Sequence, residues 1–127
     1  MRESEKDPQR LRDILEAIDN VFKYVGNCDF NSFLDDAMRY HAVVYNIMVI
    51  GEAANLLTKD FCIEHPATPW RQIIGMRNFL IHGYKQVEKD LVWQVIDKEL
   101  NILREQVKEY LNELDVLHNT FIKEKSI

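Results

Sequence analysis

The sequence predicts an all-α protein, a mostly antiparallel bundle of four main helices and a shorter fifth. Apolar residues recur at intervals of three or four over long stretches, which is the spacing of one helix face. Glycine and proline are scarce, at four and three residues, and the connections between the predicted helices are short. A chain of 127 residues fits a single domain, 1–127.

The first predicted helix begins at Asp7-Pro8, with Asp7 as the N-cap and Pro8 as the first helical residue. The helix is predicted to end at Gly26, since glycine is common at the C-terminal end of helices. Between them the helical spacing is kept by Leu11, Ile14, Leu15, Ile18, Val21, Phe22 and Val25. The stretch 29–36 predicts a short helical turn or a loop, in which Asp29 or Ser32 could be the cap.

A central helix is predicted from about 36 to 57. Its residues 42–50, AVVYNIMVI, are apolar on almost every side. Their β-branched members would also fit a strand, but the length of the segment and its lack of turn signals favour a buried helix.

A loop over 58–67 is expected to lead to the next helix, which has Thr68 as N-cap and Pro69 as first residue and ends near Gly83. The last helix is predicted to start after Asp90. Its helical spacing is kept by Ile96, Leu100, Leu103, Val107, Leu111 and Leu114. The tail, 118–127, is expected to fray.

Composition limits the classes of function. With 16 basic and 21 acidic residues the net charge is −5, so the protein as a whole repels nucleic acid, and any RNA or DNA contact needs a local basic patch. No apolar run is long enough to span a membrane, and the first ten residues lack the apolar core of a signal peptide. We therefore expect a cytoplasmic protein without membrane contact.

Metal and redox chemistry are not indicated. Cys28 and Cys62 stand far apart and are expected to be reduced thiols. The histidines lack zinc-ligand spacing, and there is no phosphate-binding glycine loop, so we expect neither a metal nor another cofactor.

Arg77 breaks the pattern of its own helix. On a helical wheel it lies in the middle of the apolar side, which is formed by Trp70, Ile73, Ile74, Leu80 and Ile81. One interpretation is an arginine whose stem covers apolar surface while its head reaches water. The other is a guanidinium required at an interface or cleft, since local rules tend to fail at functional sites.

His82 lies about 140° from Arg77 around a regular helix, so one intact helix would not aim both side chains at one small group. Unwinding at Gly83 could bring them together. A second copy facing the first across a two-fold axis could also do so. The structural alternative is a histidine that interacts favourably with the C-terminal end of its helix.

The predicted central helix carries a polar stripe formed by His41, Tyr45, Met48, Glu52 and Asn55. Because an unpaired buried carboxylate is costly, either this stripe faces solvent or Glu52 meets a cation such as Arg77.

Basic residues gather where acidic ones are missing. From His65 through Val87 there is no Asp or Glu, while this window contains Arg71, Arg77 and Lys85, and Lys89 follows. Arg71, Lys85 and Lys89 are therefore candidates for binding RNA.

An arginine side chain can bind a phosphate through two hydrogen bonds, and a histidine side chain can accept or donate a proton near neutral pH. Without a metal, this pair suits RNA cleavage by its own 2′-hydroxyl, with a base removing the proton and arginine stabilising charge on the phosphorane.

The segment 77–84, RNFLIHGY, resembles the Arg-x-x-x-x-His-x-Tyr motif of the HEPN superfamily, and more narrowly the HepT group of toxin ribonucleases. Three further segments are similar: Thr68-Pro69-Trp70, Gly51-Glu52-Ala53-Ala54 and Asp90-Leu91-Val92-Trp93. The resemblance extends from the first helix to about Leu117.

The resemblance implies a HEPN-like helical bundle that forms a homodimer, with the motifs of both copies at a shared cleft. It implies a metal-independent endoribonuclease acting on RNA, possible targets being tRNA or mRNA. Arg77 and His82 take the catalytic positions, and Asn78 the polar position after the arginine. It also implies a partner, a minimal nucleotidyltransferase antitoxin that transfers AMP to Tyr84.

Two other classes of function stay open from the residues: a non-catalytic binding subunit of a two-component nucleotidyltransferase, and a purely structural helical dimer. For Tyr84, a ring packed in the core is the structural alternative to an accessible acceptor.

Overall fold

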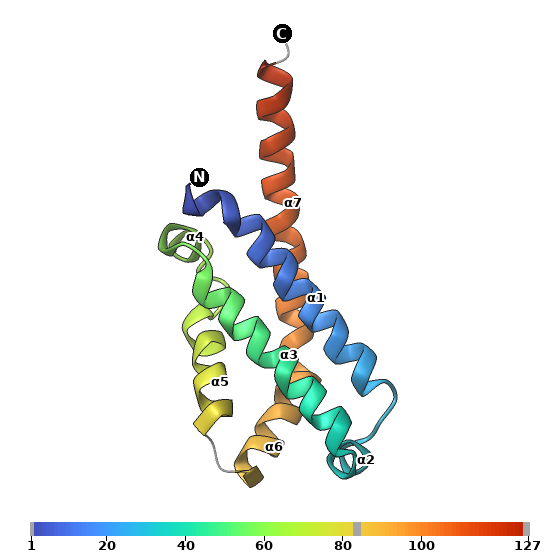
Figure 1. Cartoon of the computed structure of the whole chain (residues 1–127). Coiled ribbons are helices and arrows are strands. Elements are labelled where there is room, and N and C mark those ends of the chain that lie inside the picture. The colour runs from blue at the N-terminus through green and yellow to red at the C-terminus, as the bar shows by residue number, and fades with distance from the viewer. Residues whose placement is uncertain (1, 83–84, 126–127) are drawn as a thin grey trace.

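The computed structural model describes residues 2–82 and 85–125, and the regular secondary structure in that part of the chain is helical throughout (Figure 1). A short 3₁₀ turn, η1 (Glu3–Lys6), precedes α1 (Asp7–Val25), and α2 (Phe30–Asp35) connects α1 to the central helix α3 (Ala37–Leu56). The chain continues with α4 (Lys59–Glu64), α5 (Trp70–His82), α6 (Lys85–Gln94), η2 (Val95–Glu99) and α7 (Leu100–Lys125). The predicted all-α bundle is confirmed.

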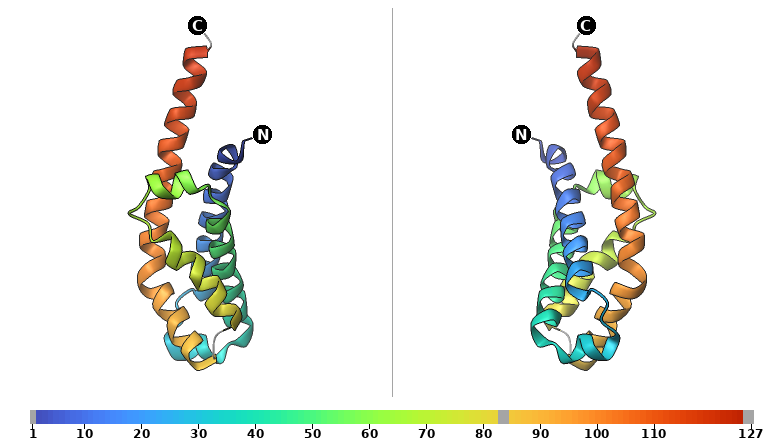
Figure 2. Two further views of the ribbon diagram at one scale, coloured as in Figure 1. Left: turned by 90° about the vertical axis from the view of Figure 1, so that its left-hand side faces the viewer. Right: turned by 90° about the vertical axis from the view of Figure 1, so that its right-hand side faces the viewer.

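The core lies between α1, α3 and α7. The apolar face predicted for α1 is buried, with Leu11, Ile14, Ile18 and Val21 fully enclosed. α3 packs along both α1 and α5, and α1 also contacts α7, while α5 lies at the edge of the bundle against α3 (Figure 2). The helix predicted over the apolar segment 42–50 is therefore confirmed, and the strand alternative is wrong.

Asp7 has a different role from the predicted one. It is buried and does not cap its own helix; its Oδ1 accepts a hydrogen bond from the Thr58 backbone N–H at 3.0 Å, and its Oδ2 accepts one from Thr58 Oγ1 at 2.7 Å. The prediction failed because a carboxylate at a helix start can also serve a distant partner. Asp7 thus fastens the start of α1 to the junction between α3 and α4.

The helices α2 and α3 each begin with an aspartate whose side chain caps the N-terminus. Asp29, one of the two predicted candidates, caps α2 by accepting from the Ser32 N–H at 2.8 Å, and this hydrogen bond holds the pKa of Asp29 below its ordinary value. Asp36 caps α3 by accepting from the Arg39 N–H. The loop predicted over 58–67 is wrong in part: it contains α4, capped by the Thr58 hydroxyl.

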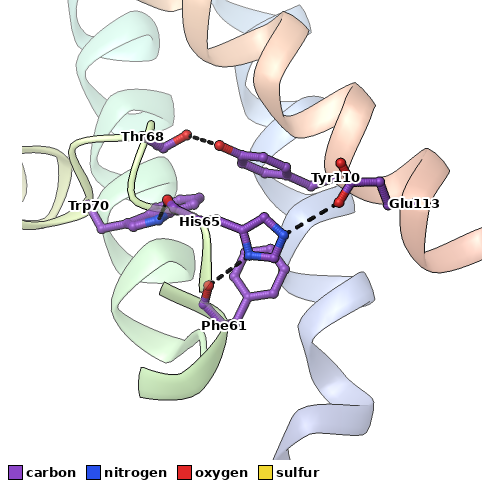
Figure 3. Close-up of polar contacts among 6 residues, drawn as sticks. All are labelled: Phe61, His65, Thr68, Trp70, Tyr110 and Glu113. Carbon is purple, nitrogen blue, oxygen red and sulfur yellow. Dashed lines mark hydrogen bonds and ion pairs between the residues drawn. The ribbon is translucent and has the colours of Figure 1, made fainter. Parts of the chain in front are cut away.

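The segment before α5 is held against α7 by a polar and aromatic junction (Figure 3). Thr68, predicted as N-cap, is buried, and its hydroxyl lies 2.6 Å from Tyr110 Oη and 2.7 Å from Gln106 Oε1, both on α7. His65 stacks on Phe61 and lies 3.5 Å from the carboxylate of α7 residue Glu113. These contacts fix where α5 starts relative to α7.

The last helical segment begins earlier than predicted. α6 starts at Lys85 rather than after Asp90, and it reaches α7 through η2, a π-helical turn, without a break in the helical backbone. The apolar period alone could not locate this start, because α6 has few apolar residues before Leu91. The predicted buried positions Ile96, Leu100, Leu103 and Val107 are confirmed.

The far end of α7 extends past the bundle (Figure 1). Leu114 still packs on the core, whereas Val116 and Leu117 are exposed. The described backbone remains helical to Lys125, and fraying of 118–127 stays a prediction.

Cys28 and Cys62 form no disulfide. Burial, followed by the charge of Asp7, raises the pKa of the Cys62 thiol. Among the described residues, no helix is both long and apolar enough to cross a membrane.

Candidate functional site

The close approach of α3 and α5 places Arg77. A Cβ added to Gly51 on α3 would lie 2.9 Å from Arg77 Cβ and 3.1 Å from the carbonyl oxygen of Ile73. Any side chain at position 51 would therefore collide with α5. Gly51 is what allows the first carbons of Arg77 to rest directly on the backbone of α3.

Arg77 forms an ion pair with Glu52, the residue next to Gly51. Arg77 Nε lies 3.0 Å from Glu52 Oε2, and the two side chains keep 39% and 48% of their surface exposed. At this exposure the pair adds little to stability. Its effect is one of orientation: the Nε edge of the guanidinium is held toward α3.

The remaining face of the Arg77 guanidinium is at the surface. Its Nη1 makes a long hydrogen bond of 3.4 Å to Oδ1 of the adjacent Asn78, which is exposed. The first interpretation is confirmed, because the stem of Arg77 lies on packed surface and its head reaches water beside a carboxylate. The second interpretation, a guanidinium required at an interface or cleft, stays a prediction. Such a group can bind a phosphate without first leaving the core.

His82 is the last residue of α5, and it is exposed. Within the described part of the chain, no hydrogen bond or ion pair links His82 to Arg77, as expected from their angular separation on one regular helix. Gly83, where unwinding was considered, and Tyr84 both lie outside the described residues.

The polar stripe of α3 faces solvent. Tyr45 is 67% exposed, His41, Glu52 and Asn55 are exposed, and Met48 is half-buried. Both alternatives considered for this stripe hold in part, because it is open to water and its Glu52 meets Arg77.

The three additional RNA-binding candidates differ in their settings. Arg71 on α5 is exposed. Lys89 is half-buried, with its ammonium 5.8 Å from the centre of the Tyr40 ring. Lys85 begins α6, but its side chain lies outside the described part of the structure. Arg71 is therefore the candidate that lies on the same helix as Arg77 and His82.

Tyr40 lies below Lys89 and is almost completely buried. Its hydroxyl donates to Glu88 Oε1 at 2.9 Å. Burial raises the pKa of Tyr40 well above its ordinary value of 10.0, and the acceptor Glu88 raises it further. This contact ties α6 to α3 near the end of α5.

Sequence reasoning missed the packing role of Gly51. The available signal was a glycine within a strongly apolar predicted helix, which indicates a close approach of backbones. In the described part of the chain no group of three His, Cys, Asp or Glu side chains could hold a metal ion.

Comparison with known proteins gives a consistent result. The family model described as ribonuclease HepT-like matches residues 14–110. A Methanocaldococcus jannaschii protein named as a candidate RNase is 32% identical over 98 residues, which cover 77% of this chain and 90% of that protein. A second protein named as a candidate RNase, from Caldanaerobacter subterraneus, is 38% identical over 101 residues, or 80% of this chain and 90% of its own.

A third relative, from Thermococcus cleftensis, carries the name "Probable ribonuclease HepT". It is 35% identical over 104 residues, which cover 82% of this chain and 93% of that protein. No solved structure was found to match the chain.

Proposed function

The chain belongs to the ribonuclease HepT-like family, and from this premise we propose that it is a metal-independent endoribonuclease toxin whose catalytic residues are Arg77 and His82. The observation that carries the proposal is the setting of Arg77. Its guanidinium is held by Glu52 on one edge and open to solvent on the other, on the same helix as an exposed His82.

In the proposed reaction the 2′-hydroxyl of RNA attacks the adjacent phosphodiester. His82 removes the proton of the 2′-hydroxyl, and the leaving 5′-oxygen takes up a proton from water. Arg77 stabilises the negative charge that builds on the phosphorane oxygens. The 2′-oxygen forms a new bond to phosphorus, and the bond from phosphorus to the 5′-oxygen breaks. The products are a 2′,3′-cyclic phosphate, which water can open, and a free 5′-hydroxyl.

The proposal includes a homodimer. Arg77 and His82 point in different directions on one helix, so a second copy across a two-fold axis can complete each site. Ile81, which is 46% accessible, lies one turn beyond Arg77 on α5, and Tyr45, which is 67% accessible, lies on the polar stripe of α3. We expect such a contact to cover both side chains.

Incubation of the protein with RNA in EDTA tests the nuclease. We expect cleavage to persist in EDTA, to require the 2′-hydroxyl, and to leave cyclic phosphate ends. Arg77→Ala should lose charge stabilisation, and His82→Ala should lose the proton transfer, which is worth about 10²–10⁴ in rate. A magnesium requirement, or full activity of His82→Ala, would contradict the mechanism.

The proposal also includes regulation by a minimal nucleotidyltransferase antitoxin that adenylylates Tyr84, which follows the last residue of α5 by two positions. Its support is the family motif at 77–84. The added phosphate would compete with RNA for Arg77, and the nucleoside would cover the cleft. Mass spectrometry after incubation with ATP, Mg²⁺ and that enzyme should find AMP on Tyr84. It should find none on the Tyr84→Phe protein.

A further inference from the structure

One face of α5 carries polar residues that the reaction does not account for. Arg71, Gly75, Asn78 and His82 follow one another at intervals of four, three and four, and all four are exposed. At 100° per residue they fall within about 60° of one another, so they form one stripe along the outside of the helix. We call this set the α5 stripe.

Gly75 has no structural reason to be glycine. A Cβ added there would meet nothing within 4 Å in the described structure, in contrast to the collision at Gly51. Glycine inside a helix is less favourable than any residue except proline. A glycine without an internal contact leaves the helix backbone open to a close approach by a group outside the chain.

The polar groups of the α5 stripe are hydrogen-bond donors suited to an anion. Arg71 and His82 flank the glycine at either end. Asn78 accepts from Arg77 Nη1 through Oδ1, so its NH₂ group remains to donate outward. The sequence from His65 through Val87 contains no acidic residue that would repel a phosphate.

On the other side of Arg77, next to Glu52, the charged side chains at the surface are mostly carboxylates. A shallow cavity of about 330 Å³ between α1 and α3 borders Glu52, and its lining includes Asp13 and Glu16. The lining also includes Arg10, so an RNA strand leaving Arg77 on that side would meet three carboxylates and one guanidinium. On the side of the α5 stripe it would meet donors.

A protein partner fits the α5 stripe less well. The exposed apolar residue of α5, Ile81, lies about 90° around the helix from the stripe. The apolar surface is thus suited to a second copy, and the stripe to a polyanion.

We propose that the α5 stripe is the track of the RNA sugar–phosphate backbone, with Gly75 as the point where a phosphate comes closest to the helix. This inference rests on the proposed ribonuclease function and extends it from the reacting phosphate to the neighbouring ones. From Arg71 to His82 the stripe is about 16 Å long at 1.5 Å per residue. It can therefore contact phosphates on one side of the cleaved bond.

Binding of a fluorescent 2′-O-methyl RNA, which cannot be cleaved, tests the track independently of the chemistry. Gly75→Ala and Gly75→Leu are compared with the parent by anisotropy and by thermal unfolding. We expect Gly75→Ala to unfold at a higher temperature and yet to bind RNA more weakly, and Gly75→Leu to bind more weakly still. A residue with a purely structural role would not separate stability from binding in this way.

The contribution of charge is tested by Arg71→Gln, with Lys59→Gln on the exposed side of α4 as the matched control. Removing one phosphate contact should lower the slope of log K against log salt by about 0.7, the value per phosphate for a single strand. The control should keep the parental slope.

Each of three results in the RNA-binding measurements would overturn the track: unchanged RNA affinity in both Gly75 variants, an unchanged salt slope in Arg71→Gln, or no RNA binding by the parent. Dissociation of a parental dimer by Gly75→Leu would assign the glycine to a protein contact and would also overturn it. A parent that binds the 2′-O-methyl RNA but cleaves no natural RNA would refute the nuclease and leave the track standing.

Discussion

Gly51 and Gly75 are both in helices, yet their surroundings are opposite. Gly51 is pressed against Arg77 and Ile73, whereas Gly75 faces open space. Substitution by alanine at the two positions therefore distinguishes the effect of packing on stability from the effect of helix propensity.

We expect Gly51→Ala to destabilise the protein by about 1–3 kcal/mol, because the added methyl must push α5 away from α3. Gly75→Ala should instead stabilise it by about 1 kcal/mol, through helix propensity alone. Urea unfolding measures both. Equal effects at the two positions would contradict the close contact at Gly51.

Tyr40 gives a prediction on pH. Its pKa is raised in the folded protein, so the folded state keeps the phenol proton that the unfolded chain releases near pH 10. The contribution of Tyr40 to stability is complete below that pH and is lost as the pH rises through the raised value. The loss of stability between pH 9 and 11 should be smaller in Tyr40→Phe, and unchanged in a Tyr24→Phe control at an exposed position.

At the scale of elements, α5 is held at its start and at its middle by different means. Its start is fixed by the junction of His65 and Thr68 with α7 (Figure 3). Its middle is fixed by the packing of Gly51 against Arg77. The geometry of Arg77 thus depends on contacts well away from the cleft.

Thr68→Val tests that dependence. The substitution keeps the shape of the side chain but removes the hydroxyl that lies between Tyr110 Oη and Gln106 Oε1. Leaving the buried Tyr110 hydroxyl without its partner should cost about 1–3 kcal/mol. In a double-mutant cycle with Tyr110→Phe, the two costs should not add, since both changes remove one hydrogen bond. If the two costs in the free energy of unfolding add, Thr68 and Tyr110 do not stabilise the protein through a shared hydrogen bond.

At the scale of the whole molecule, the exposed α3 stripe and Ile81 predict self-association. We expect light scattering to give twice the mass of one chain, and Tyr45→Glu to shift the protein toward the monomer by placing charge in the contact. The ribonuclease activity of Tyr45→Glu should decrease as its dimer fraction decreases. It should be restored at higher protein concentration, where the dimer forms again. A parent that remains monomeric at high micromolar concentration would refute the composite site.

Particular residues show how far the sequence could be interpreted. The helical spacing located α1, α3 and α5 closely, and the anomaly of Arg77 on an apolar face pointed to the candidate site. The roles of Asp7 and Thr68 were predicted wrongly, because both were treated as caps of their own helices. Their true partners, Thr58 and Tyr110, lie 51 and 42 positions away in the chain.

The sequence by itself determined the helices, the acid-free segment and the motif that links the chain to its family, because each of these depends on residues close together in the chain. Only the tertiary structure decided that Gly51 lets α5 approach α3, that Glu52 orients Arg77, and that Gly75 faces outward. Helical period indicates which residues share a face but not which face another helix will cover. That choice depends on how the whole set of helices packs to bury its apolar surface.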